Sequence, residues 1–264
     1  MIELESSTQK TCPVCSGQAT AFDVVDFNKS CEELRGKFVT LSGRSIYYFQ
    51  CHSCQFTFAP EFASWSEQDF AREIYSDHYI EHDPDYLERR PQQNFQLIEN
   101  LFGAKKAAIR HLDYGGGNGS LSALLKSSGW DSKTYDPYSS EKDTFEGLGK
   151  FNLITAFEVF EHAPNPNELM RQLIELKADD ALILFSTLTS DGNIKPHQRL
   201  TWWYASPRNG HISLYSKKSL TILASRYHLQ LGSFSPGLHC YFSTVPAWAA
   251  HLMAAKVTPP INHS

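Results

Sequence analysis

Apolar residues recur along the middle and second half of the chain at two different spacings. The stretch AAIRHLDY is largely apolar and long enough for a buried strand, whereas Leu121, Leu124 and Leu125 recur at helical spacing. The whole pattern predicts strands at 107–114, 131–136, 151–157, 180–186, 228–234 and 238–244, and helices at 119–128, 165–177 and 216–227. Because strands alternate with helices, we expect an α/β fold with a parallel or mostly parallel sheet.

A turn dense in glycine joins the first predicted strand to the first predicted helix. Its sequence, DYGGGNG, spans residues 113–119. Glycines let a ligand approach the backbone closely, and the N-terminus of the following helix offers free N–H groups. This layout predicts a nucleotide-type binding site.

The spacing of these glycines separates the possible ligands. A dinucleotide site needs G-x-G-x-x-G, but Ser120 stands where the third glycine would follow Gly115 and Gly117. The G-K-[ST] end of a P-loop is absent from the sequence. What fits is D-x-G-x-G-x-G, beginning at Asp113. A glycine-rich turn without a ligand is the alternative.

Four of the six cysteines form two pairs of identical spacing. CPVC contains Cys12 and Cys15, and CHSC contains Cys51 and Cys54. Each pair suits a tight turn that offers two thiolates, and two such turns complete a tetrahedral zinc site. We therefore expect a structural Cys₄ zinc ribbon, with a redox pair as the alternative. So small a ribbon has little core, and zinc should supply much of its folding energy.

Composition and charge narrow the possible partners. The formal net charge is −5, whereas general nucleic-acid binders are usually basic, so nucleic acid is an unlikely partner. The first ten residues lack the apolar core of a signal peptide, and no apolar run approaches the ~20 residues that a membrane span needs. We expect a cytoplasmic protein with reduced thiols and no membrane contact.

Two further segments extend the predicted site. Asp136 ends the second strand beside the glycine turn, where its carboxylate can accept both hydroxyls of a ribose. A simple Asp-Pro turn is the alternative. Too few residues separate Asp136 from Phe151 for a further helix and strand, so the third strand–helix repeat must be shortened. The segment FNLITAFEVFEHAPNPNEL then carries an E-H pair, a proline-containing turn and the start of a helix.

These three segments, in this order, resemble class I S-adenosylmethionine (SAM)-dependent methyltransferases, which include sugar and secondary-metabolite enzymes with an N-terminal zinc ribbon. The resemblance implies a Rossmann-like sheet with helices on both faces, and SAM as the cofactor. The methionine part of SAM would lie against the glycine turn, and its ribose on Asp136. The cofactor-binding residues that the resemblance implies are Asp113, Gly115, Gly116, Gly117, Asp136, Phe157, Glu158, Tyr79 and Arg90.

The resemblance also predicts the division of the chain. Residues 1–60 would form the zinc ribbon, and 61–105 a helical connector that covers the cofactor. Residues 106–245 would form the SAM-binding domain, with an insertion at 187–215, and 246–264 a C-terminal tail.

The connector is expected to be helical in pieces, with breaks around Pro84 and Pro91. In it, Tyr79, Tyr86 and Arg90 resemble residues that cover the cofactor and pair with its carboxylate. Arg89 is equally well placed, and either arginine can instead be a solvated helix charge. The residue that reads the adenine ring is not assigned.

The insertion is expected to bind the methyl acceptor, because long loops at the carboxyl edge of a parallel sheet are usually functional. Trp202, Trp203 and Tyr204 offer flat apolar surfaces, or pack onto their own domain. His211 is expected to be the general base, with an unperturbed pKa near ~6.5 and a flexible Gly210 that lets the loop bring the ring inward.

His162 is the second candidate base, or caps its turn. Glu158, Glu161 and His162 stand at i, i+3 and i+4, so a helical turn would place all three on one face, where they could hold a divalent metal.

The predicted function is a transferase that methylates an oxygen or carbon of a small molecule, with a sugar- or carrier-linked metabolite as one option. An RNA methyltransferase that docks through the ribbon is one alternative, and a non-catalytic SAM-binding protein is another. Balanced charge in residues 1–60 disfavours the first. The acceptor, the attacked atom and the oligomeric state are left open.

Overall fold

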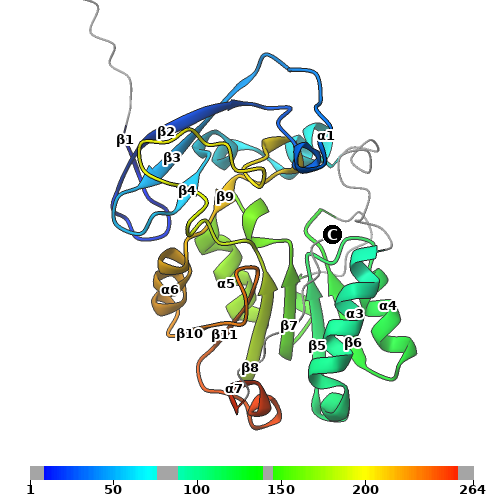
Figure 1. Cartoon of the computed structure of the whole chain (residues 1–264). Helices are drawn as coiled ribbons and strands as arrows, with labels where there is room; N and C mark the ends of the chain where they lie inside the picture. Colours follow the sequence, from blue (N-terminus) through cyan, green and yellow to red (C-terminus); the bar gives the residue numbers. More distant parts are fainter. Residues whose placement is uncertain (1–8, 76–88, 139–144, 255–264) are drawn as a thin grey trace, which may run out of the picture.

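Two β-sheets make up the framework of the chain, one above the other in Figure 1. The computed structural model describes residues 9–75, 89–138 and 145–254. No helix in these ranges is both long enough and apolar enough to cross a membrane.

The upper sheet is antiparallel and contains the expected ribbon strands. Its order is β1-β2-β3-β4-β9. The run SIYYFQC, which ends at the first cysteine of the second pair, is strand β3. The strands are β1 (Gln9–Thr11), β2 (Gln18–Asp26), β3 (Ser45–Cys51), β4 (Thr57–Phe58) and β9 (Ser213–Leu214). Strand β9 comes from the insertion, so the ribbon's sheet is completed by a distant part of the chain.

The lower sheet confirms the six predicted strands and the mostly parallel arrangement. Its order is β10-β11-β8-β7-β5-β6, with β6, β5, β7 and β8 parallel and β11 antiparallel to both of its neighbours. Among the described residues β6 is an edge strand, as expected from the shortened third repeat. The strands are β5 (Arg110–Tyr114), β6 (Asp131–Tyr135), β7 (Phe151–Phe157), β8 (Lys177–Ser186), β10 (Gln230–Ser233) and β11 (Leu238–Phe242).

Helices cover both faces of the lower sheet, as the family resemblance implied. Alternate residues of the central strands enter two different cores: Leu153 and Leu182 one, Ile154 and Ile183 the other. Helices α3 and α4 pack on the first core, and α5 and α6 on the second. The helices are α1 (Glu67–Glu73), α3 (Arg89–Phe102), α4 (Ser120–Ser127), α5 (Pro166–Leu176), α6 (Lys217–Arg226) and α7 (His251–Ala254), with 3₁₀ turns η1 (Cys31–Arg35), η2 (Pro60–Ser64), η3 (Gly103–Ala108), η4 (Phe145–Gly147), η5 (Phe160–His162), η6 (Pro207–Asn209) and η7 (Ala247–Ala249).

The helix boundaries follow from local chemistry. The Asn165 side chain accepts hydrogen bonds from the backbone N–H groups of Asn167 and Glu168, and Pro166 is the first residue of α5, where no N–H is needed. The predicted break around Pro91 is wrong, because α3 continues through this residue, and the break expected around Pro84 lies outside the described residues. Pro91 stands in the first turn of α3, which tolerates proline.

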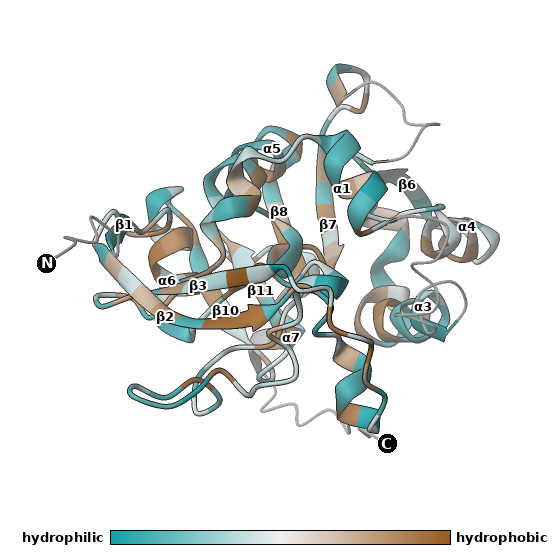
Figure 2. Cartoon of the chain, turned by 90° about the horizontal axis from the view of Figure 1, so that it is seen from above, coloured by the Kyte–Doolittle hydropathy of each residue, from teal (hydrophilic) through white to brown (hydrophobic). Residues whose placement is uncertain are grey.

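The helices differ in hydropathy. Figure 2 shows that α1 is mostly hydrophilic, whereas α3 and α5 contain both hydrophilic and hydrophobic segments.

A third hydrophobic cluster joins the ribbon, the connector and the insertion. It contains Tyr48 of β3, Phe62 of η2, and Trp202, Tyr204 and Leu214 of the insertion, all of them buried. The insertion is therefore packed against the ribbon, and its Tyr204 and Ile212 are hydrogen-bonded to Glu161 in the turn after β7.

Candidate functional site

The glycine turn is held tightly against its neighbours. The Gly115 N–H donates a hydrogen bond to the carbonyl oxygen of Tyr135 at 2.7 Å. Gly115 has φ +72°, and a Cβ on it would lie 2.5 Å from a methyl group of Val159. A side chain at residue 115 would therefore collide with Val159, because the turn after β5 and the turn after β7 are in direct contact.

Asp113 braces the glycine turn from below. Its side chain is buried, and its Oδ1 accepts a hydrogen bond from the Thr155 hydroxyl at 2.9 Å. A Cβ at Gly116 would collide with this carboxylate. Burial raises the pKa of Asp113 to about 7, against the effect of the Thr155 hydrogen bond. Asp113 thus reaches the backbone of the turn, and its predicted cofactor contact stays a prediction.

Asp136 stands beside the turn at the end of β6. Its Oδ2 accepts from the N–H of Gly117, and its Oδ1 from the N–H of Tyr138, both at 2.8 Å. The carboxylate is half-buried and fixed in orientation, and each oxygen keeps a second lone pair. This arrangement would suit a pair of ribose hydroxyls, and the predicted contact of Asp136 with a ribose stays a prediction.

Phe157 and Glu158 end β7 at the same edge of the sheet. Glu158 has φ +53°, a strained value for a residue other than glycine. Its N–H donates to the hydroxyl of Ser186 at 2.8 Å, and this hydroxyl donates to its Oε1 at 2.7 Å. The strained backbone and the bond to β8 turn the Glu158 side chain toward Ser186.

The predicted cofactor cover is only partly described. Tyr79 and Tyr86 lie outside the described residues. Arg90 stands near the start of α3 and is half-buried, whereas Arg89 is exposed. Burial lowers the pKa of both His162 and His211, and the charge of Arg90 adds to this lowering.

Three side chains converge where η5 meets the insertion. Glu161, His162 and His211 each place one possible ligand atom within 4.8 Å of the others. The two imidazole centroids are 4.9 Å apart. The expected trio of Glu158, Glu161 and His162 is therefore wrong as a cluster. The 3₁₀ turn begins only at Phe160, so Glu158 does not share its face, and His211 takes the third place.

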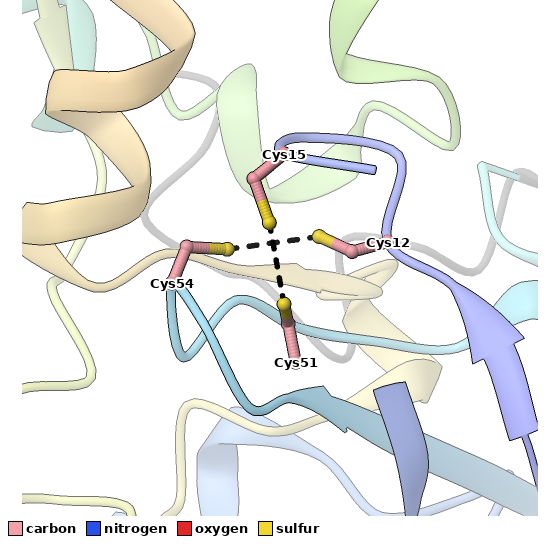
Figure 3. Close-up of side chains that lie close together, drawn as sticks. All are labelled: Cys12, Cys15, Cys51 and Cys54. Atoms are coloured by element: carbon pink, nitrogen blue, oxygen red, sulfur yellow. Dashed lines mark hydrogen bonds between the residues drawn. The ribbon is translucent and has the colours of Figure 1, made fainter. Parts of the chain in front are cut away.

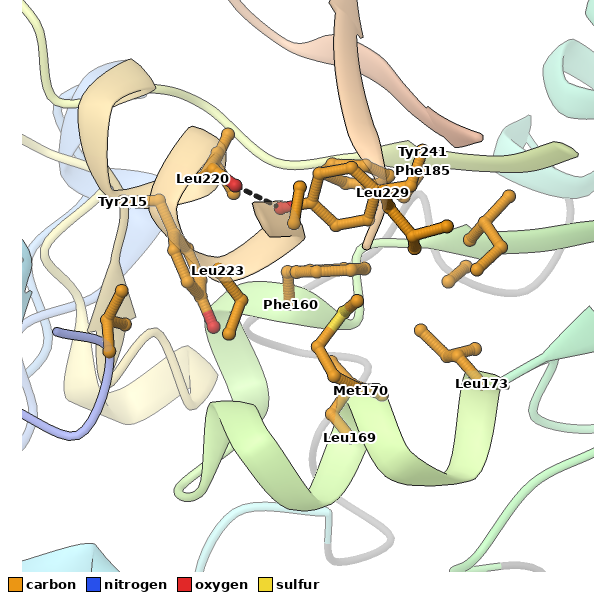
Figure 4. Close-up of a cluster of buried hydrophobic side chains, with 14 of the residues drawn as sticks. Phe160, Leu169, Met170, Leu173, Phe185, Tyr215, Leu220, Leu223, Leu229 and Tyr241 are labelled. Atoms are coloured by element: carbon orange, nitrogen blue, oxygen red, sulfur yellow. Dashed lines mark hydrogen bonds between the residues drawn. The ribbon is translucent and has the colours of Figure 1, made fainter. Parts of the chain in front are cut away.

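A large aromatic core anchors this turn. Phe160 is fully buried and stacks on Phe185 with ring centroids 4.1 Å apart. Figure 4 shows Phe160 between side chains of α5, such as Met170, and side chains in and just before α6, such as Tyr215. This packing holds Phe160, the first residue of η5, in place, and so positions the turn that carries Glu161 and His162.

His211 is a buried, oriented ring rather than a mobile one. Its Nδ1 lies 2.9 Å from the carbonyl oxygen of Tyr204. A carbonyl only accepts, so Nδ1 carries the proton and Nε2 keeps a free lone pair. Burial lowers the pKa of His211 to about 3, so the expectation of an unperturbed pKa is wrong, although the ring is neutral at pH 7 as required of a base.

Gly210 has a different role from the one expected. It has φ +84°, and a Cβ on it would lie 2.8 Å from Nδ1 of His162 and 3.2 Å from the hydroxyl of Tyr75. The glycine is needed for close approach of the insertion to the η5 turn, and not as a hinge.

Glu161 is fully buried and only half satisfied. Its Oε1 accepts a hydrogen bond from the Tyr204 hydroxyl at 2.7 Å. Its Oε2 is buried and has no hydrogen-bond partner among the described residues. Burial, and next the charge of Glu158, raise the pKa of Glu161 well above its usual range. A free carboxylate oxygen beside two imidazoles fits a divalent cation, which would satisfy it.

The aromatic residues that were predicted to bind the acceptor lie close to His211. Trp202 and Tyr204 are buried in the third cluster, and Trp203 is half-buried. The Tyr204 ring lies 4.2 Å from the His211 ring, between centroids. Tyr204 thus packs against His211, and Trp202 packs against Tyr204. The contact of these aromatic residues with an acceptor stays a prediction.

The four ribbon cysteines converge on one point (Figure 3). Sγ of Cys12 is 3.6 Å from that of Cys54, and Sγ of Cys15 is 3.3 Å from that of Cys51. A disulfide would need about 2.05 Å, whereas sulfurs around a tetrahedral zinc at ~2.3 Å lie about 3.8 Å apart. The residues fit a zinc ion that all four thiolates would hold, with no position left for a substrate.

Two tyrosines that contact the histidines were not predicted. The Tyr75 hydroxyl lies 3.0 Å from Nδ1 of His162, and the Tyr48 hydroxyl donates to the carbonyl oxygen of His211 at 2.7 Å. Tyrosine is common in buried cores, and each partner is far away in the chain, so no local pattern marks them.

Comparison with known proteins identifies the family of this chain. A family model described as "Methyltransferase domain" matches residues 86–233. None of the curated proteins matches the sequence. Solved structures that are similar include the plantazolicin methyltransferase BpumL in complex with S-adenosyl-L-homocysteine (SAH), at 16% identity and a TM-score of 0.48, over 69% of this chain and 95% of that one.

Two further structures are similar. The magnesium protoporphyrin IX methyltransferase ChlM from Synechocystis PCC 6803, with bound SAH, is 14% identical with a TM-score of 0.42, over 70% of this chain and 98% of that one. DesVI of Streptomyces venezuelae is 13% identical with a TM-score of 0.46, over 65% of this chain and 99% of that one.

Proposed function

Because this chain belongs to the methyltransferase-domain family, we propose that it transfers the methyl group of SAM to an oxygen or an acidic carbon of a small molecule. One observation carries the proposal. The glycine turn touches Val159, and only Phe160 separates Val159 from the Glu161–His162–His211 cluster. The glycine turn, against which SAM would lie, and the Glu161–His162–His211 cluster are thus close together at one edge of the sheet, the edge where α/β folds bind their ligands.

The roles of the residues follow from their geometry. SAM supplies a methyl group already activated on a sulfonium, so the protein has mainly to align the acceptor with the S–CH₃ bond. The glycine turn and Asp136 hold the cofactor. Nε2 of His211 accepts the proton of the acceptor while the bond from the methyl to the acceptor forms and the S–CH₃ bond breaks, which leaves SAH. His162 lies beside this ring and keeps it in place.

Loss of the Asp136 carboxylate should weaken binding of the cofactor. In Asp136→Ala we expect the affinity for SAH to fall by about 1.5–3 kcal/mol for each lost hydrogen bond to the charged group. The Gly117 N–H also loses its acceptor, which adds to the effect. Calorimetry with SAH measures the change. Asp131→Ala, at the exposed opposite end of β6, is the matched control and should bind SAH normally. Equal affinity in both variants would remove Asp136 from the site.

The unpartnered Oε2 of Glu161 favours a second way of activating the same acceptor. Glu161, His162 and His211 would hold a divalent cation, which lowers the pKa of an acceptor hydroxyl when bound. Two imidazoles and one carboxylate suit a first-row transition metal that keeps open positions for the acceptor. The Nδ1–H of His211, donated to Tyr204, would fix the ring as in other metal-bound histidines.

Titration with Mn²⁺ distinguishes these two possibilities. If the cluster holds a cation, the zinc-loaded protein should remove one equivalent of Mn²⁺ from the paramagnetic resonance signal of the free ion. Glu161→Gln keeps the acceptor for Tyr204 but should weaken this site by roughly 10–100-fold or more. Glu175→Gln, an exposed residue of α5, is the control. If wild-type protein leaves all Mn²⁺ free, the cation is excluded and His211 acts as the base alone.

A further inference from the structure

A short segment of the insertion links the ribbon to the η5 turn. On the ribbon side, the Ala59 N–H donates to the carbonyl oxygen of Ile212 at 2.9 Å, and β9 pairs with β4. On the other side, the Ile212 N–H donates to the carbonyl oxygen of Glu161 at 2.9 Å, and the Ser213 hydroxyl to that of Ala163 at 2.7 Å. Residues 212–214 are thus bonded to both, and His211 stands directly before them.

The ribbon also holds His211 itself. Tyr48 comes from β3, is fully buried, and donates its hydroxyl hydrogen to the carbonyl oxygen of His211. Nearby, the Lys29 ammonium donates to the carbonyl oxygen of Trp202 at 3.0 Å. The Cys31 N–H donates to the side-chain oxygen of Asn209 at 2.8 Å. Each of these bonds joins the N-terminal sixty residues to the insertion.

The cysteine cluster is tied to the far end of the same segment. The Ser216 hydroxyl donates to the carbonyl oxygen of Cys54 at 2.5 Å, and its oxygen accepts from the Ser219 N–H at 3.0 Å, where it caps α6. The segment from His211 to Ser216 therefore runs along the ribbon from Tyr48 to the second cysteine pair. A ligand-bound knuckle would fix one end of it, and the β3 strand the other.

We infer that the ribbon is a positioning element of the acceptor site, which sets the His211 ring against Glu161 and His162 through residues 211–216. Tyr48 is the positioning residue that acts most directly, because it binds the His211 backbone. This gives the ribbon a task within the domain, in place of docking a separate macromolecule. The inference rests on the proposed function only in calling this the acceptor site; the placement of the ring can be measured without turnover.

The test compares two neighbouring tyrosines. Tyr48→Phe removes the hydroxyl that binds His211, whereas Tyr47→Phe changes the next residue of β3, which is 54% exposed. Both full-length variants, labelled with ¹⁵N-histidine, would be compared by NMR of the imidazole nitrogens, together with zinc content, melting temperature and SAH calorimetry.

In wild type and Tyr47→Phe we expect a single His211 form protonated at Nδ1. In Tyr48→Phe this single form should be lost to a mixture of tautomers, while zinc content stays at one per chain and SAH affinity changes by less than about twofold, within the effect of one distant hydrogen bond. A folded Tyr48→Phe protein with an unchanged His211 signal overturns the inference. If Tyr48→Phe does not fold, Lys29→Met removes another of these bonds, and the same outcomes apply. Failure to bind SAH in wild type would instead contradict the proposed function.

Discussion

Replacing Cys12 and Cys51 with serine together is expected to abolish zinc binding and to unfold the ribbon. Each variant sulfur belongs to a different pair, so neither pair can hold the ion alone. Structural zinc sites contribute on the order of 10–16 kcal/mol of binding free energy, which here is mostly folding free energy. The cysteines share a core with Phe160 and Tyr215, so the loss should extend to the insertion and the η5 turn.

Metal analysis and thermal unfolding measure this effect. The wild-type protein should contain about one zinc per chain, and the double variant none, with a melting temperature lowered by many degrees. Cys240→Ala is the matched control, because Cys240 is also buried but lies in β11, in the other core. A wild-type protein that is fully folded without zinc would exclude the structural site.

His211→Ala is expected to lower the rate of methyl transfer by roughly 10²–10⁴-fold, the usual effect of losing a positioned base. Its Nε2 is the free nitrogen of a ring that is buried, neutral and fixed by Tyr204. SAH affinity should stay nearly constant, since the predicted cofactor contacts lie at Asp136 and the glycine turn.

Turnover of SAM to SAH with a methylated product measures the rate, and calorimetry measures the affinity. His228→Ala changes an exposed histidine just beyond α6 and should retain the wild-type rate. If SAH affinity falls together with turnover in His211→Ala, the ring is a structural support of the insertion. If turnover is retained, His162 becomes the better candidate base.

The parts of the fold that depend on local pattern were predictable. Apolar runs and helical spacing located the strands and helices of the lower sheet, because burial on both faces of a sheet leaves a continuous apolar signal. The glycine turn was equally visible, since Gly115 must avoid Val159 and leave room for a ligand. The cysteine pairs were visible because metal-binding knuckles have a fixed spacing.

The cluster of Glu161, His162 and His211 was only partly predictable. Each of the three was a candidate residue from the sequence, but the approach of His211 to the other two depends on a strand of two residues, too short to leave a periodic pattern. The expected i, i+3, i+4 spacing of Glu158, Glu161 and His162 also failed. The left-handed backbone of Glu158 is not helical, so its side chain does not share a face with the two residues of the η5 turn. Long-range hydrogen bonds such as Tyr48 to His211 have no local signature at all.

The central claim is that this protein methylates a small molecule with SAM. The most direct measurement incubates the full-length protein with methyl-labelled SAM and pooled metabolite extracts, and follows the label by mass spectrometry. We expect SAH together with a small molecule heavier by one labelled methyl group, both absent with His211→Ala. Bound SAM without any SAH formation would indicate a non-catalytic binding protein, and label recovered in added RNA rather than in small molecules would contradict the claim.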